Sequence, residues 1–233
     1  MLDLTRQERI RSRYRDTRPG YRTAREVYAG ILSRLVHRDI ILLDAGCGQA
    51  GLVEGYCGLA HMVVGVDKCL RRFRESIKVK DLVEGGLEAL PFPNEVFSLI
   101  TCSWVLEHLE NPIAVLIEIT RVLRPGGHFL FLTPNALNYT IWLSRLIPNT
   151  MRQRMVREIY GREETFTFPA FYRANTHRWL DKTLTRLGYE CEVFEYVGDP
   201  SYIAFNEFLF RLAVMFEKVT DKVWPQGKVH MVG

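Results

Sequence analysis

An apolar run that leads directly into a glycine-rich turn constrains this chain more than any other feature. The run covers residues 40–44 and ends in Asp44, and the turn has glycine at positions 46, 48 and 51. A short continuous apolar run is typical of a strand buried on both faces of a parallel sheet. Glycines after such a strand let backbone N–H groups and a helix N-terminus approach a ligand closely, because no Cβ atom intervenes. We therefore expect a ligand-binding α/β fold.

The rest of the chain alternates between strand-like runs and helical periodicity. Apolar runs predict further strands at 62–66, 77–83 (a weak run), 97–103, 128–133, 189–196 and, as an edge strand, 229–232. Apolar residues at helical spacing predict helices at 23–36, 111–123, 177–187 and 205–219. Alternating strands and helices imply right-handed crossovers and a mostly parallel sheet with helices on both faces. The sequence therefore predicts a doubly wound α/β sheet.

Composition limits the remaining function classes. The 233 residues suffice for one buried α/β domain, and a net charge of +4 does not by itself indicate nucleic-acid binding. No appended RNA-binding module or interleaving of aromatic and basic residues is found, which argues against a nucleic-acid partner. The five cysteines are odd in number and form no C-x-x-C pair, which favours a reducing, cytoplasmic setting and predicts no metal site. No signal-peptide region opens the chain, and no apolar run reaches the roughly 18 residues of a membrane span.

Residues 135–175 break the alternation and are expected to insert one or two helices after the fifth strand. They carry Arg145, Arg152, Arg154, Arg157 and Arg162. These arginines could pair with an anionic acceptor such as a phosphorylated lipid or sugar, or they could simply keep the surface soluble.

The predicted helix at 205–219 has a broad apolar stripe. Its members are Phe205, Phe208, Leu209, Leu212, Met215, Phe216 and Val219. The stripe could be core, a dimer face or an interfacial patch that meets a lipid-like acceptor, and we favour a place in the core or in a lid.

Two acidic residues decide between two interpretations of the glycine turn. The pattern G-x-G-x-x-G with Asp67 about 20 residues on also matches dinucleotide-binding domains and would suit a nicotinamide-dependent oxidoreductase. Asp44, two residues before Gly46, would repel a pyrophosphate but attract an ammonium group and a sulfonium. Asp67 ends the second strand, where a carboxylate can accept hydrogen bonds from both ribose hydroxyls. A glycine turn beside two acids favours a cationic nucleoside.

Motifs over residues 40–135 resemble those of class I S-adenosylmethionine-dependent methyltransferases. The motif segments, in the expected order, are residues 42–48, 87–93 with 97–100, 105–109, 122–127 and 133–135. The small-molecule subgroup known as methyltransferase type 11, which includes quinone, lipid and sugar methylating enzymes, is the nearest pattern. The resemblance implies a seven-stranded sheet in a single domain. Its expected parts are an N-terminal helical cover (1–36), a cofactor-binding core (37–134), a helical insertion that caps the acceptor (135–175) and a C-terminal part (176–233).

The same resemblance assigns S-adenosyl-L-methionine as cofactor and implies residues that bind it. Those at the methionine portion are Asp44, Gly46, Cys47 and Gly48, and those at the ribose and adenine are Asp67, Lys68, Cys69, Gly86, Leu87 and Glu88. Ser103, Trp104 and His108 are expected near the methionine tail and the methyl group, and Tyr14, Arg18 and Tyr21 in a segment folded over the cofactor. Where the family commonly has an acid that contacts the adenine amino group, this chain has Gly86; a backbone carbonyl or Glu88 could substitute.

Methyl transfer from a sulfonium is an in-line displacement, so the protein mainly supplies alignment and a shaped, dehydrated cleft. An acceptor that must lose a proton also needs a base, and His108 and His177 are the candidates because imidazole titrates near neutral pH. Each could instead line a loop or cap a helix. The predicted acceptor is a small molecule, lipid-like compound or sugar; peripheral membrane contact and a monomer or homodimer stay open. A catalytically inactive scaffold on the same fold is the third hypothesis.

Overall fold

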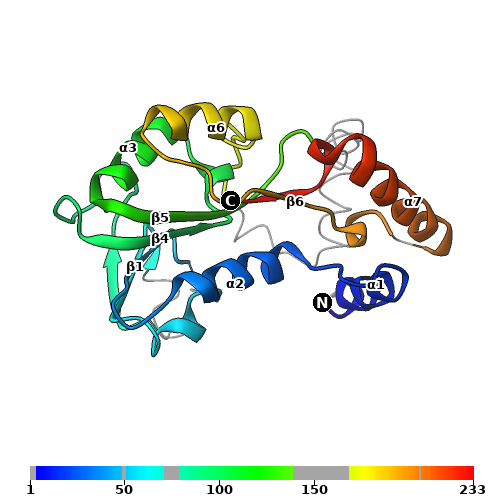
Figure 1. Cartoon of the computed structure of the whole chain (residues 1–233), viewed down its shortest axis with the longest axis horizontal. Helices are drawn as coiled ribbons and strands as arrows, with labels where there is room; N and C mark the ends of the chain where they lie inside the picture. Colours follow the sequence, from blue (N-terminus) through cyan, green and yellow to red (C-terminus); the bar gives the residue numbers. More distant parts are fainter. Residues whose placement is uncertain (1–3, 49–50, 71–78, 139–167, 205) are drawn as a thin grey trace. The chain divides into compact units, whose positions relative to one another are not determined.

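The computed structural model describes residues 4–48, 51–70, 79–138, 168–204 and 206–233 (Figure 1). The chain divides into two compact units. The first, here called the sheet unit, comprises Arg25–Thr133, Ala170–Phe194 and Val232–Gly233. The second, here called the helical unit, comprises Met1–Ala24, Pro134–Pro169 and Glu195–Met231. The predicted subdivision into a cover, a cofactor core, an insertion and a C-terminal part stays a prediction, and most of the predicted insertion lies outside the described residues.

Seven strands form one sheet in the order β3-β2-β1-β4-β5-β7-β6. The strands are β1 (Ile41–Ala45), β2 (Met62–Asp67), β3 (Asp81–Glu84), β4 (Phe97–Ser103), β5 (Leu123–Pro134), β6 (Glu195–Val197) and β7 (His230–Val232). β1 pairs in parallel with β2 and β4, β2 with β3, and β4 with β5. Leu42 and Leu43 of β1 are fully buried, as expected for a strand covered on both faces. The predicted seven-stranded, mostly parallel α/β sheet is confirmed.

Helices lie on both faces of the sheet. Figure 1 shows α2 (Ala24–Leu35) on one face and α3 (Pro112–Val122) and α6 (His177–Arg186) on the other. Local sequence sets these helices: Asn111 caps α3 by accepting a bond from the Ala114 N–H, and Pro112 occupies the first turn, where its missing N–H costs nothing. Two short 3₁₀ turns, η1 (Glu54–Tyr56) and η3 (Leu106–His108), complete the described helical segments of this unit.

Two strand predictions near the C-terminus were wrong. The strand predicted at 189–196 is reduced to the three residues of β6, and the predicted edge strand at 229–232 is an inner strand, because β7 lies between β5 and β6. Phe131 and Gly233 exchange both of their backbone hydrogen bonds, at 2.8 and 3.2 Å, which is the pattern of antiparallel neighbours. All three β7 residues are buried accordingly.

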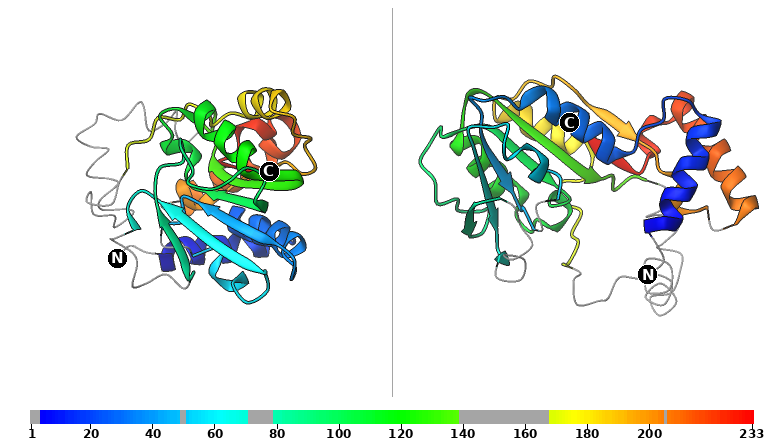
Figure 2. Two further views of the ribbon diagram at one scale, coloured as in Figure 1. Left: turned by 90° about the vertical axis from the view of Figure 1, so that its left-hand side faces the viewer. Right: turned by 90° about the horizontal axis from the view of Figure 1, so that it is seen from below.

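The helical unit is built around a small aromatic cluster. It contains α1 (Leu4–Thr17), η5 (Pro200–Tyr202), α7 (Glu207–Val223) and η6 (Pro225–Gly227). Tyr14 of α1 packs with Ala204 and with Phe210 of α7. The guanidinium of Arg11 binds Asp199 at 2.6 Å and ties α1 to the turn that precedes η5. Figure 2 shows the two helices from other directions.

Of the two favoured positions for the stripe on residues 205–219, the core was wrong for four of its members, and the lid stays a prediction, as do the dimer face and the interfacial patch. Phe208, Leu212, Met215 and Val219 are exposed, and Phe210 and Ala213 of α7 are buried in their place. Phe205 lies outside the described residues. Among the helices that the structure describes, none is long and apolar enough to cross a membrane.

Candidate cofactor site

The glycine turn is held at the carboxyl ends of β1 and β2. The N–H groups of Gly46 and Cys47 both donate to the carbonyl oxygen of Val66, at 2.8 and 3.0 Å. Gly46 has φ +77°, and a Cβ atom there would lie 2.4 Å from Cγ2 of Val105 in the turn after β4. Only glycine fits this position, because a side chain would be strained by the backbone and would collide with Val105. The turn that follows β1 is therefore held in place by the end of β2 and by the turn after β4.

Asp67, the last residue of β2, binds the same turn directly. Its Oδ2 accepts the N–H of Gly48 and its Oδ1 accepts the N–H of Cys69, each at 2.9 Å. A carboxylate oxygen has two lone pairs, so each oxygen keeps acceptor capacity for a ligand hydroxyl. The structure thus places Asp67 at the turn, with its carboxylate oriented by two backbone donors.

Asp44, at the end of β1, is a buried carboxyl beside this turn. Its side chain is 3% exposed and accepts a hydrogen bond from the Thr101 hydroxyl at 2.9 Å. Burial raises the pKa of Asp44 to about 7, the negative charge of Asp67 also raises it, and the bond from Thr101 acts in the opposite direction. No cation balances this charge among the partners of Asp44 in the described residues. A positively charged ligand group would therefore stabilise the ionised carboxylate.

The residues predicted to flank the adenine gather at the ends of β2 and β3. Lys68 Nζ lies 3.3 Å from Glu88 Oε1. A Cβ atom on Gly86 would lie 3.0 Å from Glu88 Oε2 and 3.2 Å from Lys68 Cε, so a larger residue would push this ion pair away. Leu87, which lies between Gly86 and Glu88 in the sequence, is buried. The Gly85 N–H donates to the Asp67 carbonyl oxygen at 3.0 Å. The segment around Gly86 is thereby attached to the end of β2.

Ser103 and Trp104 occupy the end of β4, on the other side of β1. Trp104 has φ +58°, a conformation that non-glycine residues rarely adopt, and its N–H donates to the Leu132 carbonyl of β5 at 2.8 Å. Strained backbone of this kind concentrates at functional sites. His108 follows at the end of η3, with its side chain 32% exposed. The predicted residues from Asp44 to His108 therefore all belong to the carboxyl-end turns of β1, β2, β3 and β4.

A buried polar network beside His108 was missed in the sequence. Glu107 Oε2 accepts the Thr133 hydroxyl at 3.1 Å, Thr133 accepts from the Asn175 amide at 2.5 Å, and Glu107 Oε1 lies 3.9 Å from His108 Nε2. Burial raises the pKa of Glu107. The one sequence signal that could have indicated this network was the position of Glu107 directly before His108 in the motif at 105–109. Thr133 and Asn175 come from distant parts of the sequence, so spacing alone could not connect them.

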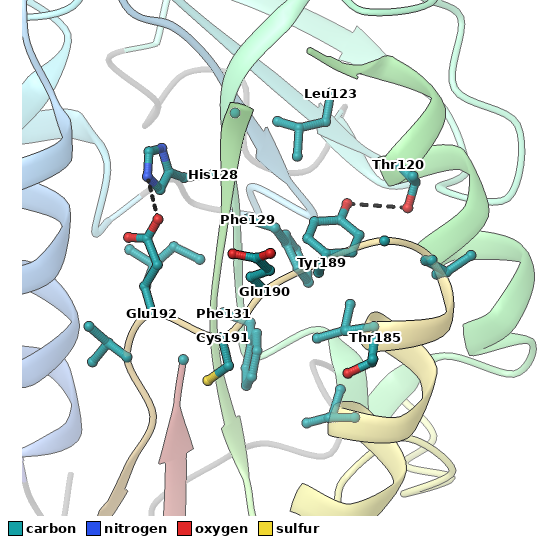
Figure 3. A pocket seen from close by; sticks show the side chains of 18 of the residues that line it. Thr120, Leu123, His128, Phe129, Phe131, Thr185, Tyr189, Glu190, Cys191 and Glu192 are labelled. Carbon is teal, nitrogen blue, oxygen red and sulfur yellow. Dashed lines mark hydrogen bonds and ion pairs between the residues drawn. The ribbon is translucent and has the colours of Figure 1, made fainter. Parts of the chain in front are cut away.

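His177, the second candidate base, lies in the wall of a cavity elsewhere in the sheet unit. The cavity has a volume of about 650 Å³ and is lined by residues of β5, α6 and the segment that follows α6 (Figure 3). The His177 ring stacks on Phe194 with ring centres 4.1 Å apart. None of the residues predicted to bind the cofactor lines this cavity. The structure therefore does not bring His108 and His177 together in one pocket.

Tyr14 and Arg18 belong to the helical unit. Tyr14 is fully buried there, and its hydroxyl accepts a bond from Arg18 Nη1 at 3.2 Å. Arg18 also forms an ion pair with Asp221 of α7. These contacts give both residues a structural role within their unit, and their predicted position over the cofactor stays a prediction.

Comparison with known proteins points to one family. Residues 43–131 match the family described as Methyltransferase domain. A protein of Mycolicibacterium smegmatis named as a probable S-adenosylmethionine-dependent methyltransferase is 32% identical over 123 residues, covering 52% of this chain and 47% of the relative. A ubiquinone biosynthesis O-methyltransferase of Thiobacillus denitrificans is 37% identical over 103 residues, covering 40% of this chain and 44% of the relative. The chain thus spans less than half the length of these relatives.

Solved structures show the same fold. The crystal structure of an S-adenosylmethionine-dependent methyltransferase from Mesorhizobium loti superposes with a TM-score of 0.57 at 17% identity, covering 90% of this chain and 95% of that chain. At this level of identity the likeness establishes the fold, and the family assignment rests on the sequence match over 43–131.

Proposed function

Since this chain belongs, through residues 43–131, to the class I S-adenosylmethionine-dependent methyltransferases, we propose that it transfers the cofactor's methyl group to a small-molecule, lipid-like or sugar acceptor. One observation carries the proposal. Asp44 and Asp67 stand at neighbouring strand ends on either side of a turn in which a Cβ atom at residue 46 would be 2.4 Å from Val105. This arrangement fits a cationic nucleoside and disfavours an incoming pyrophosphate.

The residues present fit S-adenosylmethionine. Asp44 would pair with the ammonium group of the methionine portion, and the turn at 46–48 would lie along it. Asp67 would accept the ribose hydroxyls, which suits a carboxylate already oriented by the N–H groups of Gly48 and Cys69. Lys68, Cys69 and the segment 86–88 would flank the adenine. When bound, the cofactor supplies a methyl group made electrophilic by the sulfonium.

The chain's own contribution to the reaction would be alignment and, for an acidic acceptor group, removal of a proton. His108 is the candidate base that belongs to the same turns as the cofactor residues, with Glu107 beside it. His177 stays a second candidate, associated with the cavity in Figure 3. The relative named as a ubiquinone biosynthesis O-methyltransferase supports a small-molecule acceptor.

Calorimetry with S-adenosylhomocysteine tests the cofactor assignment, and titration with reduced nicotinamide dinucleotide tests the dehydrogenase alternative. We expect saturable binding of the first ligand and none of the second. Saturation by the nicotinamide ligand, with no heat from S-adenosylhomocysteine at millimolar concentration, would overturn the proposal. Incubation of small-molecule and lipid extracts with methyl-labelled cofactor then identifies the acceptor class. Binding without label transfer to any extract would favour a scaffold role.

A further inference from the structure

Helix α7 exposes a continuous apolar surface, here called the α7 stripe. Its members and their exposed fractions are Phe208 (68%), Leu212 (37%), Met215 (59%), Val219 (51%) and Val223 (77%). They recur at intervals of three or four residues, so they lie on one side of the helix. From Phe208 to Val223 the stripe extends about 22 Å along the helix axis. A row of this length differs from the single exposed apolar residues of an ordinary surface.

The stripe is not the face that α7 uses to pack in its own unit. The buried residues of α7 are Phe210, Ala213, Glu217 and Thr220, which lie on the opposite side of the helix. Phe210 packs with Tyr14 and Ala204. The helix therefore packs in its unit through a side that is half polar, and the more apolar side is left exposed.

Basic residues accompany the stripe along one edge. Arg211, Lys218 and Lys222 are exposed and, at a rotation of about 100° per residue, project next to the apolar side chains. Glu207 is the one acid of α7 classed as exposed, and its carboxylate is already bound by Arg13 and by Arg211. No ion pair involves Lys218 or Lys222 within the part of the chain that the structure describes. Trp224, directly after α7, is 44% exposed, and tryptophan is enriched where membranes meet water.

We propose that α7 binds in the plane of an anionic lipid bilayer, with the α7 stripe among the outer parts of the acyl chains and its basic edge against acidic headgroups. An apolar face with a basic border is the composition of helices that lie in the interface. Lysines at such a surface attract acidic lipids over a distance limited by salt screening. A second copy of the chain suits the stripe less well, because it would bring two basic edges together with no unengaged acid of α7 opposite them.

Flotation of the full chain with vesicles tests this proposal independently of methyl transfer. Vesicles of phosphatidylcholine containing phosphatidylserine should carry the protein, and pure phosphatidylcholine vesicles should carry much less. Met215→Glu with Val219→Glu should abolish flotation, and Ile117→Glu, at a residue of α3 that is 49% exposed, is the matched control that should float as the unchanged protein does. Lys218→Gln and Lys222→Gln should each weaken partitioning roughly fivefold, and Lys182→Gln on α6 should not.

Two results would overturn the proposal. One is a failure to bind acidic vesicles through the stripe: either the unchanged protein does not float with them, or the stripe and lysine variants float as well as the unchanged protein does. The other is a dimer in sedimentation that Val219→Glu dissociates, with no vesicle binding, since the stripe would then be covered by a second copy. Retained S-adenosylhomocysteine binding by each variant shows that the sheet unit is folded, and failure of that binding in the unchanged protein would bear on the proposed function alone.

Discussion

The carboxylate of Asp67 accepts the backbone N–H of Gly48 at 2.9 Å, so the end of β2 orients the turn that follows β1. A ligand bound at this turn meets a carboxylate whose direction is fixed before binding. Pre-oriented acceptors bind with a smaller loss of side-chain freedom than mobile ones do. The same contact makes Asp67 part of the turn's structure and part of the proposed ribose site.

Substitution of Asp67 should therefore weaken the cofactor complex. We expect Asp67→Ala to cost roughly 1–3 kcal/mol in S-adenosylhomocysteine affinity, the usual effect of losing a charge-assisted hydrogen bond. Calorimetry at constant pH measures the change. Asp81→Asn, at the exposed first residue of the neighbouring strand β3, is the control and should bind normally. Equal affinities for Asp67→Ala and the unchanged protein would show that the ribose lies elsewhere.

The buried carboxyl of Asp44 should make cofactor binding depend on pH. Its pKa is raised to about 7 by burial, whereas a bound ammonium group favours the ionised form. Below about pH 7 the Asp44 carboxyl is protonated in the free protein and must lose that proton when the ligand binds. The dissociation constant of S-adenosylhomocysteine should therefore rise up to tenfold for each unit by which the pH falls below about 7. Affinity measured from pH 5.5 to 8 tests this. Asp44→Asn should bind weakly at every pH with no slope; an unchanged slope would assign the titration to another group.

Gly46 should resist substitution for a reason that a second substitution can relieve. In Gly46→Ala the new Cβ atom would collide with Val105, and alanine would also be strained by the φ of +77° at this position. Together these two effects should lower the free energy of unfolding in urea by on the order of 1–3 kcal/mol. Addition of Val105→Ala should recover the part due to the collision and leave the part due to the backbone. Gly55→Ala, where no atom lies within 4 Å, should change stability little. Additive effects of the two substitutions would argue against the contact.

Local patterns predicted the strands that carry the site. The runs at 62–66 and 97–103 became β2 and β4 because central parallel strands are apolar throughout, and the acids that end β1 and β2 fell at neighbouring strand ends as a direct result. The order of β7 and β6 could not be predicted in this way. It depends on the pairing of Phe131 with Gly233, which are far apart in sequence, and β6 has only three residues to signal it.

The side of α7 that is buried was also beyond the sequence. Acids are rarely buried, so the side of the helix that carries Glu217 gives no sequence signal of burial, and the prediction rested on the apolar stripe instead. In the structure Glu217 is 1% exposed, and a Cβ atom on Gly198 would overlap its carboxylate. The buried position of Glu217 thus depends on the close approach of Gly198 and on charges from distant parts of the sequence. Neither of these contributions leaves a periodic signal in the sequence of the helix.

His108 and Glu107 should act as a base and its positioning residue if the acceptor must lose a proton. His108→Asn should then lower kcat by roughly 10²–10⁴. Glu107→Gln removes the carboxylate 3.9 Å from the imidazole and, if Glu107 orients the ring, should lower kcat with little change in KM or Tm. Glu110→Gln, an exposed acid close in sequence, should leave kcat unchanged. A lower Tm with an unchanged kcat in Glu107→Gln would mean that Glu107 supports the fold only.

Glu217 should lower the stability of the folded chain as the pH rises. Burial raises its pKa from 4.5 to about 7; Asp221 and Asp199 also raise it, and Lys228 and Arg18 oppose them. Between these pH values the folded chain keeps a proton that the unfolded chain has lost, so the free energy of unfolding falls from about pH 4.5 to about pH 7 and is then constant. Glu217→Gln should be close to neutral at pH 4.5 and should raise Tm by several degrees at pH 8.

Glu207 provides the opposite case on the same helix. Hydrogen bonds from Arg13 and Arg211 lower its pKa to about 2, so the folded chain loses its proton more easily than the unfolded chain does. The stability due to Glu207 is present above about pH 4.5 and is lost as the pH falls toward 2, and Glu207→Gln should not raise Tm at pH 8. Thermal unfolding of both variants across this range separates the two signs. A parallel response of the two variants would mean that the Glu217 carboxyl is hydrated in solution, because burial is the largest cause of its raised pKa.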